Sequence, residues 1–383
     1  MSTHLIQFVR NYFNTSEFIP LHAPVFPGRE KEYVADTIES TFVSSVGAYV
    51  DRFEKDMAAY TSSSRAVATV NGTAALHVAL RLAGVEAGDL VITQPLTFVA
   101  TCNAIAYCNA EPVFVDVDRH TLGLSPRALE AWLEENARLD AEGTCRAKSD
   151  IKAIRACLPM HTFGHPADLD GLVAVCSRWN IALVEDAAES LGSFYKGRHT
   201  GTFGRLGTLS FNGNKIMTTG GGGMILASEE LSQRAKHLTT TAKQPHAYEY
   251  IHDEVGYNYR MPNLNAALGC AQLEQLESFI QTKRALAQRY QDFFKDSPFE
   301  FVKEPPQCRS NYWLNAVICE DSQQRDALLK ETNEQGVMTR PIWMLMSRLA
   351  MYSNCRKGDL RNAQWLEARI VNLPSSVSDE GSA

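Results

Sequence analysis

A single amine stands at the end of an apolar, strand-like run and within a loop of small polar residues. The run begins at Thr208 and leads to Lys215, and four glycines follow at 220–223. A second apolar run, starting at Ile181, ends in the carboxylate of Asp186. A lysine can form a Schiff base with an aldehyde, and a carboxylate can keep a pyridine nitrogen protonated so that the ring accepts electrons. The pair suits an enzyme that holds pyridoxal phosphate (PLP).

Two further candidates follow apolar runs earlier in the chain. Thr73 and Ala74 lie where a predicted strand joins a helix, and backbone N–H groups at a helix N-terminus bind phosphate. Phe98 follows the next strand, where its ring can stack on a flat cofactor. Taken singly, these residues also fit ordinary turn, cap and core positions. Four such features in this order, each after a strand, are improbable by chance.

The elements that must position these residues alternate between strands and helices. We predict strands at 66–70, 90–93, 112–117, 153–159 and 181–186, and helices at 29–40, 51–60, 73–83, 98–108, 125–139 and 169–180. Ser125 is the expected N-cap of its helix, with Pro126 at the first helical position. This alternation predicts an α/β fold with a mainly parallel sheet covered by helices. Ligands of such sheets bind at the carboxyl ends of the strands.

The pattern changes at Pro262, so we place a large domain at 1–261 and a smaller α/β domain at 262–383. In the second we expect helices at 263–279, 282–295, 323–335 and 362–371 and a strand at 312–319. Residues 140–150 are predicted to form a surface loop, and 375–383 a frayed tail.

Composition narrows the partners and the location. The 383 residues carry a net charge of -7, which does not indicate the excess of basic residues that binding to nucleic acid or an anionic membrane needs. The nine cysteines form no C-x-x-C pair, and no apolar run is long enough to span a bilayer, so we expect a cytoplasmic protein. His161 and His165 lack a third ligand at metal spacing, so no metal site is predicted.

Together, the motifs resemble the DegT/DnrJ/EryC1/StrS family of PLP-dependent sugar aminotransferases over roughly residues 19–377. They are Asn71-Gly-Thr-Ala-Ala-Leu-His77, Gln94-Pro-Leu-Thr-Phe-Val-Ala-Thr101, Glu185-Asp-Ala-Ala-Glu-Ser190, Ser210-Phe-Asn-Gly-Asn-Lys215 and Gly256-Tyr-Asn-Tyr-Arg-Met-Pro262. Four further segments, Ser44–Gly47, the lysine loop, Arg340–Trp343 and Asn372–Ser376, resemble the branch that aminates UDP-4-keto-6-deoxy-N-acetylhexosamines for legionaminic acid and bacillosamine. The resemblance implies the type I aminotransferase fold.

The resemblance also implies a role for each matching residue. Lys215 would carry the cofactor and then move a proton, Asp186 would pair with the pyridine nitrogen, and Phe98 would stack on the ring. Thr73, Ala74 and Ser210 would bind the phosphate. Asn258 would reach the phosphate in a partner subunit, which implies a homodimer with shared sites. Glu189 stands near the ring hydroxyl, where many relatives carry Gln or His.

The substrate contacts are expected at Lys243, His246 and Trp343. Lys243 and His246 suit a nucleotide diphosphate, although solvated surface is an equal alternative for both. Ser347 and Ala350 stand where the family pattern has His and Pro, which puts substrate positioning beyond Trp343 in doubt.

The activity implied is transfer of an amino group from L-glutamate to C4 of a nucleotide-linked 4-keto-6-deoxy sugar, with UDP-4-keto-6-deoxy-N-acetylglucosamine as the first expectation. A GDP-4-keto-6-deoxymannose aminotransferase, of the perosamine type, shares every motif quoted above. A PLP-dependent sugar dehydratase is a further alternative, but such enzymes replace the lysine, typically by His. A non-catalytic regulatory protein on the same fold would have no need for the Lys215 amine.

Overall fold

The computed structural model describes residues 2–378, and its centre is a mainly parallel sheet. Within these residues the seven strands lie in the order β1-β11-β10-β7-β6-β2-β3. Their bounds are β1 Arg65–Thr69, β2 Leu90–Thr93, β3 Glu111–Phe114, β6 Ile154–Leu158, β7 Ala182–Asp186, β10 Leu206–Ser210 and β11 Gly223–Ala227. Only β11 is antiparallel to its neighbours, so β1, β7 and β10 end at the same edge.

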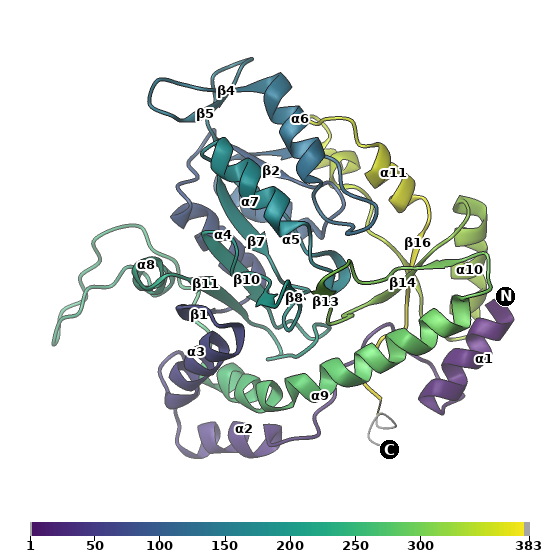
Figure 1. Ribbon diagram of the computed structural model, residues 1–383. Coiled ribbons are helices and arrows are strands. Elements are labelled where there is room, and N and C mark those ends of the chain that lie inside the picture. The colour runs from purple at the N-terminus through teal and green to yellow at the C-terminus, as the bar shows by residue number, and fades with distance from the viewer. Residues whose placement is uncertain (1, 379–383) are drawn as a thin grey trace.

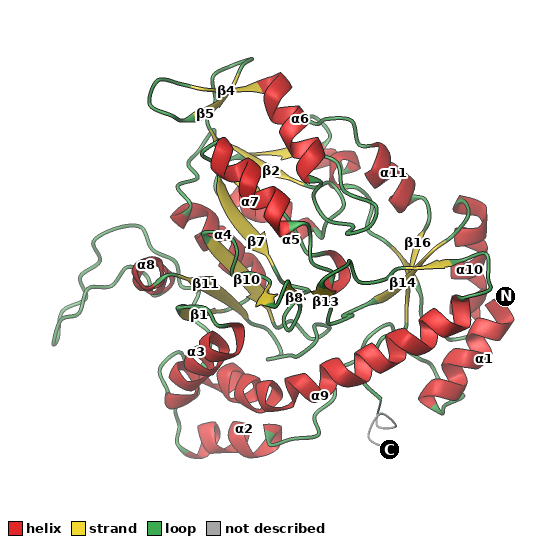
Figure 2. Ribbon diagram, viewed as in Figure 1, coloured by secondary structure: helices red, strands yellow, loops and turns green. Residues whose placement is uncertain are grey.

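Helices cover both faces of this sheet, which is why the strands are short apolar runs (Figure 2). Val184 on β7 packs in one cluster with residues of α4 (Gly72–Leu82), α5 (Val99–Tyr107) and α8 (Glu229–Thr239). Its neighbour Leu183 packs on the opposite face with α6 (Pro126–Asn136) and α7 (Leu169–Arg178). The predicted α/β alternation is therefore confirmed, including the Ser125 cap, whose hydroxyl accepts from the N–H of Ala128 at 3.2 Å.

The largest departure from the predicted elements is α9, one helix from Asn263 to Phe294 rather than two. The break expected at 280–281 does not occur because no Pro or Gly interrupts the buried stripe there. Ile280 and Lys283 are fully buried and continue that stripe toward Tyr290. The N-terminal half packs on α2 (Glu30–Glu39) and α3 (Ala48–Thr61), as Figure 1 shows.

The C-terminal part holds an antiparallel sheet in the order β12-β14-β16-β15. Its strands are β12 Glu300–Phe301, β14 Asn315–Ile318, β16 Ile370–Leu373 and β15 Arg340–Pro341, with helices α10 Ser322–Glu334 and α11 Arg361–Glu367 beside them. The helix predicted at 362–371 thus ends at Glu367, because Ile370 and Val371 pair with β14 instead. The packing of α1 (Ser2–Phe13) in the same apolar cluster as the end of α9 was also not predicted.

Two further segments differ from the prediction. Residues 137–139, predicted as the end of a helix, form β4 (Ala137–Leu139), which pairs with β5 (Cys145–Ala147) inside the predicted loop 140–150. Ser375 and Ser376, predicted to fray, are buried: the Ser375 hydroxyl accepts from the N–H of Asn315 at 2.8 Å. The last part of that predicted tail, 379–383, lies outside the described residues.

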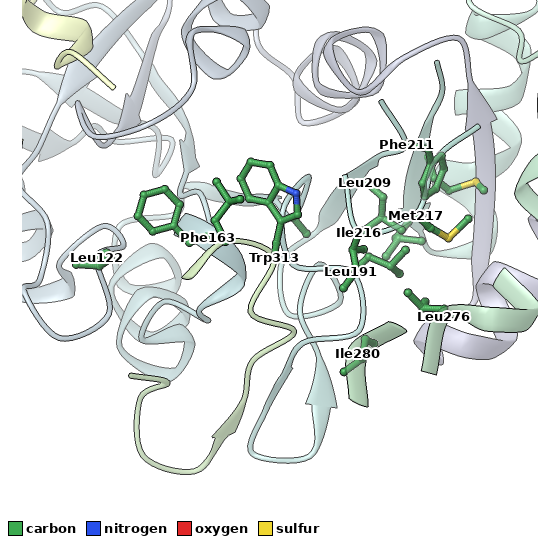
Figure 3. Close-up of a cluster of buried hydrophobic side chains, with 14 of the residues drawn as sticks. Leu122, Phe163, Leu191, Leu209, Phe211, Ile216, Met217, Leu276, Ile280 and Trp313 are labelled. Atoms are coloured by element: carbon green, nitrogen blue, oxygen red, sulfur yellow. The ribbon is translucent and has the colours of Figure 1, made fainter. Parts of the chain in front are cut away.

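Between the sheet and α9 lies an apolar cluster that supports the lysine loop (Figure 3). Phe211, Ile216 and Met217 flank Lys215 in the chain, and all three are buried in this cluster. Leu276 and Ile280 of α9 pack in the same cluster. The residues on both sides of the amine are thereby immobilised by core packing. In residues 2–378, no helix is both long and apolar enough to cross a bilayer.

The buried amine of Lys283 is expected to make stability depend on pH. Burial lowers the pKa of Lys283 to about 7, while the amine donates to the carbonyl of Ser375. The unfolded chain binds this proton up to about pH 10, so wild-type stability should rise between pH 7 and pH 10. Lys283→Met should flatten this rise, which urea unfolding at both pH values measures. An equally steep rise in the variant would contradict the assignment, and Lys295→Met at an exposed site is the control.

Candidate active site

A cavity of 310 Å³ opens at the carboxyl ends of the central strands, where the sequence placed the ligand. Residues from three strand ends, from the lysine loop and from the C-terminal part line it. They are Asn71, Gly72, Thr73, Leu76, Phe98, Ala100, Met160, Asp186, Ala188, Glu189, Ser210, Asn212, Asn214, Lys215, Gly221, Gly222, Trp313 and Trp343. The structure therefore brings Lys215, Asp186, Glu189, Phe98, Thr73, Ser210 and Trp343 together from the predicted set.

One end of the cavity is a cradle around the N-terminus of α4. A side chain at Gly72 would place its Cβ only 2.8 Å from the Cβ of Ser210, so glycine is needed for this close approach. Asn71 caps the helix by accepting from the N–H of Ala74 at 2.8 Å. That bond occupies the N–H of Ala74, and Ala74 does not line the cavity. Thr73 and the hydroxyl of Ser210 do line it and suit a phosphate group at a helix N-terminus.

Asp186 ends β7 with its carboxylate buried and oriented. Its Oδ2 accepts from the hydroxyl of Thr101 at 2.8 Å, and its Oδ1 accepts from the N–H of Ala188 at 3.2 Å. Burial raises the pKa of this carboxyl, although both hydrogen bonds and the charge of Lys215 act in the opposite direction. A cationic ring nitrogen beside it would favour the ionised form. The geometry therefore suits the pyridine nitrogen of PLP.

The amine of Lys215 lies between a carboxylate and an aromatic ring. Its Nζ is 3.3 Å from Oε1 of Glu189 and 4.1 Å from the ring centroid of Trp313. The Trp313 indole N–H donates to the carbonyl of Asn214 at 2.7 Å and so fixes the loop directly before the lysine. Lys215 is only 9% exposed, which means that its amine is directed into the site and away from bulk solvent.

Two aromatic side chains form the outer wall of the cavity. Phe98 immediately precedes α5 and is 48% exposed, which is unusual for a large apolar ring. Its centroid lies 6.5 Å from that of Trp343, with the two rings edge to face. The exposed ring of Phe98 in this cavity suits stacking on a flat ring. Its predicted stacking role and the substrate role of Trp343 stay predictions.

Three other predicted site residues do not line this cavity. Asn258 is exposed and accepts from the guanidinium of Arg260 at 3.0 Å. Lys243 and His246 lie on a segment, residues 243–256, that projects from the body beside α8 (Figure 1). Lys243 stacks on Tyr250 at 4.1 Å, and His246 accepts from the N–H of Glu249 at 2.9 Å. The role of Asn258 in a partner subunit's site and the contact of Lys243 and His246 with a nucleotide diphosphate stay predictions.

Sequence reasoning assigned no role to three residues that position the site, Thr101, Asn311 and Trp313. Thr101 lies one helical turn after Phe98, a spacing that marks it as a same-face neighbour. Asn311 donates to the carbonyls of Glu189 at 2.8 Å and Leu191 at 2.9 Å. Asn311 and Trp313 come from the segment before β14, about 100 residues beyond the lysine, and no local pattern links them to it.

The two histidines considered as metal ligands have other surroundings. His161 accepts from the N–H of Ala167 at 3.1 Å and lies 3.1 Å from Oε2 of Glu185, so both ring nitrogens have partners. Burial lowers the pKa of His165 to about 4. In the part of the chain that is described, His237, Asp253 and Glu254 lie close enough to share an ion, but Arg234 already pairs with both oxygens of Glu254.

Comparisons with known proteins show the family to which the chain belongs. Residues 27–380 match the DegT/DnrJ/EryC1/StrS aminotransferase family. GDP-perosamine synthase of Escherichia coli O157:H7 is 36% identical over 368 residues, 95% of each chain. EpsN of Bacillus subtilis (strain 168), a putative pyridoxal phosphate-dependent aminotransferase, is 38% identical over 85% of this chain and 81% of its own length. The crystal structure of the aminotransferase TlmJ from Streptoalloteichus hindustanus is similar with a TM-score of 0.84. It is 27% identical, and the match covers 94% of this chain and 93% of the TlmJ chain.

The chain therefore belongs to the DegT/DnrJ/EryC1/StrS aminotransferase family. It is a PLP-dependent aminotransferase with the type I fold, as the motifs predicted. The residues fit the cofactor: a phosphate cradle that a Cβ at Gly72 would fill, a buried carboxylate at Asp186 and an amine at Lys215. The predicted UDP-sugar branch is not supported by the relatives described above.

Proposed function

We propose that the protein moves an amino group from L-glutamate to C4 of a GDP-linked 4-keto-6-deoxy sugar, with GDP-4-keto-6-deoxymannose as the leading substrate. The observation that carries this choice is the 36% identity, over 95% of both chains, to a protein named GDP-perosamine synthase. The UDP-linked N-acetyl sugar, which the sequence motifs first favoured, is the competing substrate. The intact Lys215 argues against the dehydratase and the non-catalytic alternatives.

Each polar residue of the cavity then has a defined task. Bound PLP supplies an electron sink that permits an amino group to pass from an amino acid to a keto sugar. Asp186 holds a proton at the ring nitrogen, and Thr101 keeps its carboxylate oriented. Lys215 would hold the cofactor through its amine, and its Nζ would take up and return the substrate proton. Thr73 and Ser210 anchor the phosphate at the α4 N-terminus.

The shape of the site also serves the reaction. Phe98 and Trp343 line one side of the cavity and would limit the access of water to the reacting atoms. Trp313 holds the lysine loop through Asn214, so the amine returns to one position between the two halves of the reaction.

A substrate panel tests the proposal. The loaded enzyme is incubated with glutamate and, in separate reactions, GDP-, UDP- and dTDP-linked 4-keto-6-deoxy sugars, and mass spectrometry detects exchange of the keto oxygen for an amino group. We expect efficient amination of the GDP sugar. Preference for the UDP-linked N-acetyl sugar would overturn the proposed base and restore the first expectation. Lack of amination with all three would reject the nucleotide-sugar assignment.

The shared-site dimer gives a prediction at Asn258. If Asn258 completes a partner's phosphate site, Asn258→Ala should weaken PLP retention at both sites of the dimer. Mixing this variant with Lys215→Ala subunits should recover activity, because one site of each hybrid dimer contains both intact residues. Random mixing gives about one quarter of wild-type activity. PLP-loaded monomers that remain fully active on dilution would contradict the shared site.

A further inference from the structure

His161 is fully buried beside the end of β7 and is not part of the cavity wall. Its Nδ1 accepts from the N–H of Ala167 at 3.1 Å, so Nε2 is the ring nitrogen that donates to Oε2 of Glu185, also at 3.1 Å. Glu185 directly precedes Asp186, and successive side chains of a strand point to opposite faces of the sheet. His161 therefore binds β7 on the face opposite to the one from which Asp186 enters the cavity.

The Glu185 carboxylate is held from two sides. Its Oε1 accepts from the N–H groups of Phe203 at 2.6 Å and Gly204 at 2.7 Å, and its Oε2 accepts from the N–H of Gly201 at 2.7 Å. Burial acts to raise the pKa of this carboxyl, but the hydrogen bonds from His161, Gly201 and Gly204 outweigh burial and hold the pKa below its usual value. A buried carboxylate depends on all of these donors, because a buried charge without partners is costly. The turn at 201–204 fixes one side of Glu185, and His161 fixes the other.

His161 also contacts the residue that faces the cofactor site. Its backbone N–H donates to the carbonyl of Asp186 at 3.2 Å, and the N–H of Asp186 donates to the carbonyl of Pro159 at 2.9 Å. One residue thus binds both members of the Glu185–Asp186 pair, the first through its ring and the second through its backbone. The peptide between the two acidic residues is planar, so a displacement of Glu185 also turns Asp186.

We propose that His161 is a positioning residue, which fixes Glu185 and thereby sets the direction in which the Asp186 carboxylate meets the pyridine nitrogen of PLP. The inference rests on the proposed role of Asp186. Thr101 and the N–H of Ala188 orient the carboxylate itself. His161 orients the backbone that carries this carboxylate, from outside the cavity.

The test measures the dissociation constant of PLP from the full-length apoenzyme by equilibrium dialysis. In His161→Asn, the shorter amide can still accept from the N–H of Ala167 but cannot reach Glu185. We expect PLP to bind about tenfold more weakly, the lower end of what a hydrogen bond to a charged group contributes. The melting temperature of the apoenzyme reports any general loss of stability separately.

A double-mutant cycle distinguishes positioning from a general role in the fold. If His161 acts through Asp186, adding His161→Asn to Asp186→Ala should change the dissociation constant by less than about twofold, because the carboxylate that it positions is absent. Weakening by the same factor in both backgrounds would show that His161 acts on the fold as a whole and would overturn the proposal.

Two further variants make the result specific. His161→Gln places a donor near the position of Nε2 but leaves the N–H of Ala167 without its partner, so we expect a smaller loss of about threefold, which again vanishes with Asp186→Ala. This variant carries the cycle if the Asn variant does not fold. His120→Asn, at an exposed histidine, should bind PLP as the wild type does. A loss in the Gln variant as large as in the Asn variant, or no loss in the variant that carries the cycle, would also overturn the proposal.

The assay separates this inference from the proposed function. It uses neither glutamate nor a sugar, so its outcome is independent of the substrate panel. If Asp186→Ala bound PLP as tightly as the wild type, the role of Asp186 would be rejected, and the role of His161 with it. Weaker binding in Asp186→Ala, together with equal effects of His161→Asn in both backgrounds, would reject only the role of His161.

Discussion

Lys215→Ala is expected to lower the turnover number by a factor of at least about 10² to 10⁴. This factor is the contribution of a positioned acid–base group alone. The loss should be larger than this because the same amine also anchors the cofactor. The phosphate cradle and Asp186 remain intact, so the variant should still bind PLP weakly. Amino transfer from glutamate, followed by mass spectrometry of the sugar product, measures the change.

Two control measurements show whether the effect of Lys215→Ala is specific to the amine. Lys330→Ala removes a lysine that is exposed on α10, and it should retain wild-type turnover. The melting temperature of Lys215→Ala should remain close to that of the wild-type apoenzyme, since the cluster around Phe211, Ile216 and Met217 is unchanged. Turnover near the wild-type value would remove Lys215 from the catalytic role.

Asp186→Ala is expected to keep the fold but to slow the half-reaction with glutamate by a factor of roughly 10² to 10³. Removal of one preorganised electrostatic group from an active site typically has an effect of this size. Without the carboxylate the ring nitrogen loses its proton, and the cofactor accepts electrons poorly. Single-turnover spectroscopy should show that the starting absorbance band persists after glutamate is added. Unchanged kinetics would exclude Asp186 from this role.

Thr101→Val provides a graded comparison for Asp186. The variant removes the hydroxyl that donates to Asp186 Oδ2 and preserves the volume of the side chain. Since the N–H of Ala188 still holds Oδ1, the loss should be smaller than for Asp186→Ala. Equal losses would mean that orientation of the carboxylate is as important as its charge.

The central part of the fold was predictable because its signals are local. Short apolar runs separated by amphipathic helices predict a parallel sheet, and Asp186, Phe98 and Thr73 each lie at the end of such a run or within a few residues after it. Parallel strands that share one edge then bring these residues together, whatever the length of chain between them. The site residues at strand ends could therefore be found without a structure.

Other features were hidden because tertiary packing decides them. Thr282 in α9 has weak helix propensity, yet the buried stripe through Ile280 and Lys283 keeps the helix continuous. Asn311 and Trp313 act on the site only because β14 folds back beside it. The N–H of Ala74 was expected to face the cavity, but the side chain of Asn71 binds it first.

The continuity of α9 also constrains how the two ends of the molecule can vary. At 32 residues the helix is about 48 Å long, and it carries the face that packs on α2 and α3 at one end and the face that packs near α1 at the other. Each residue advances the helix by about 100°, so one insertion near its middle would turn the second face away from its partners. Viable changes of length there should come as whole turns, and evolutionary variation in the size of this enzyme is expected in its surface loops.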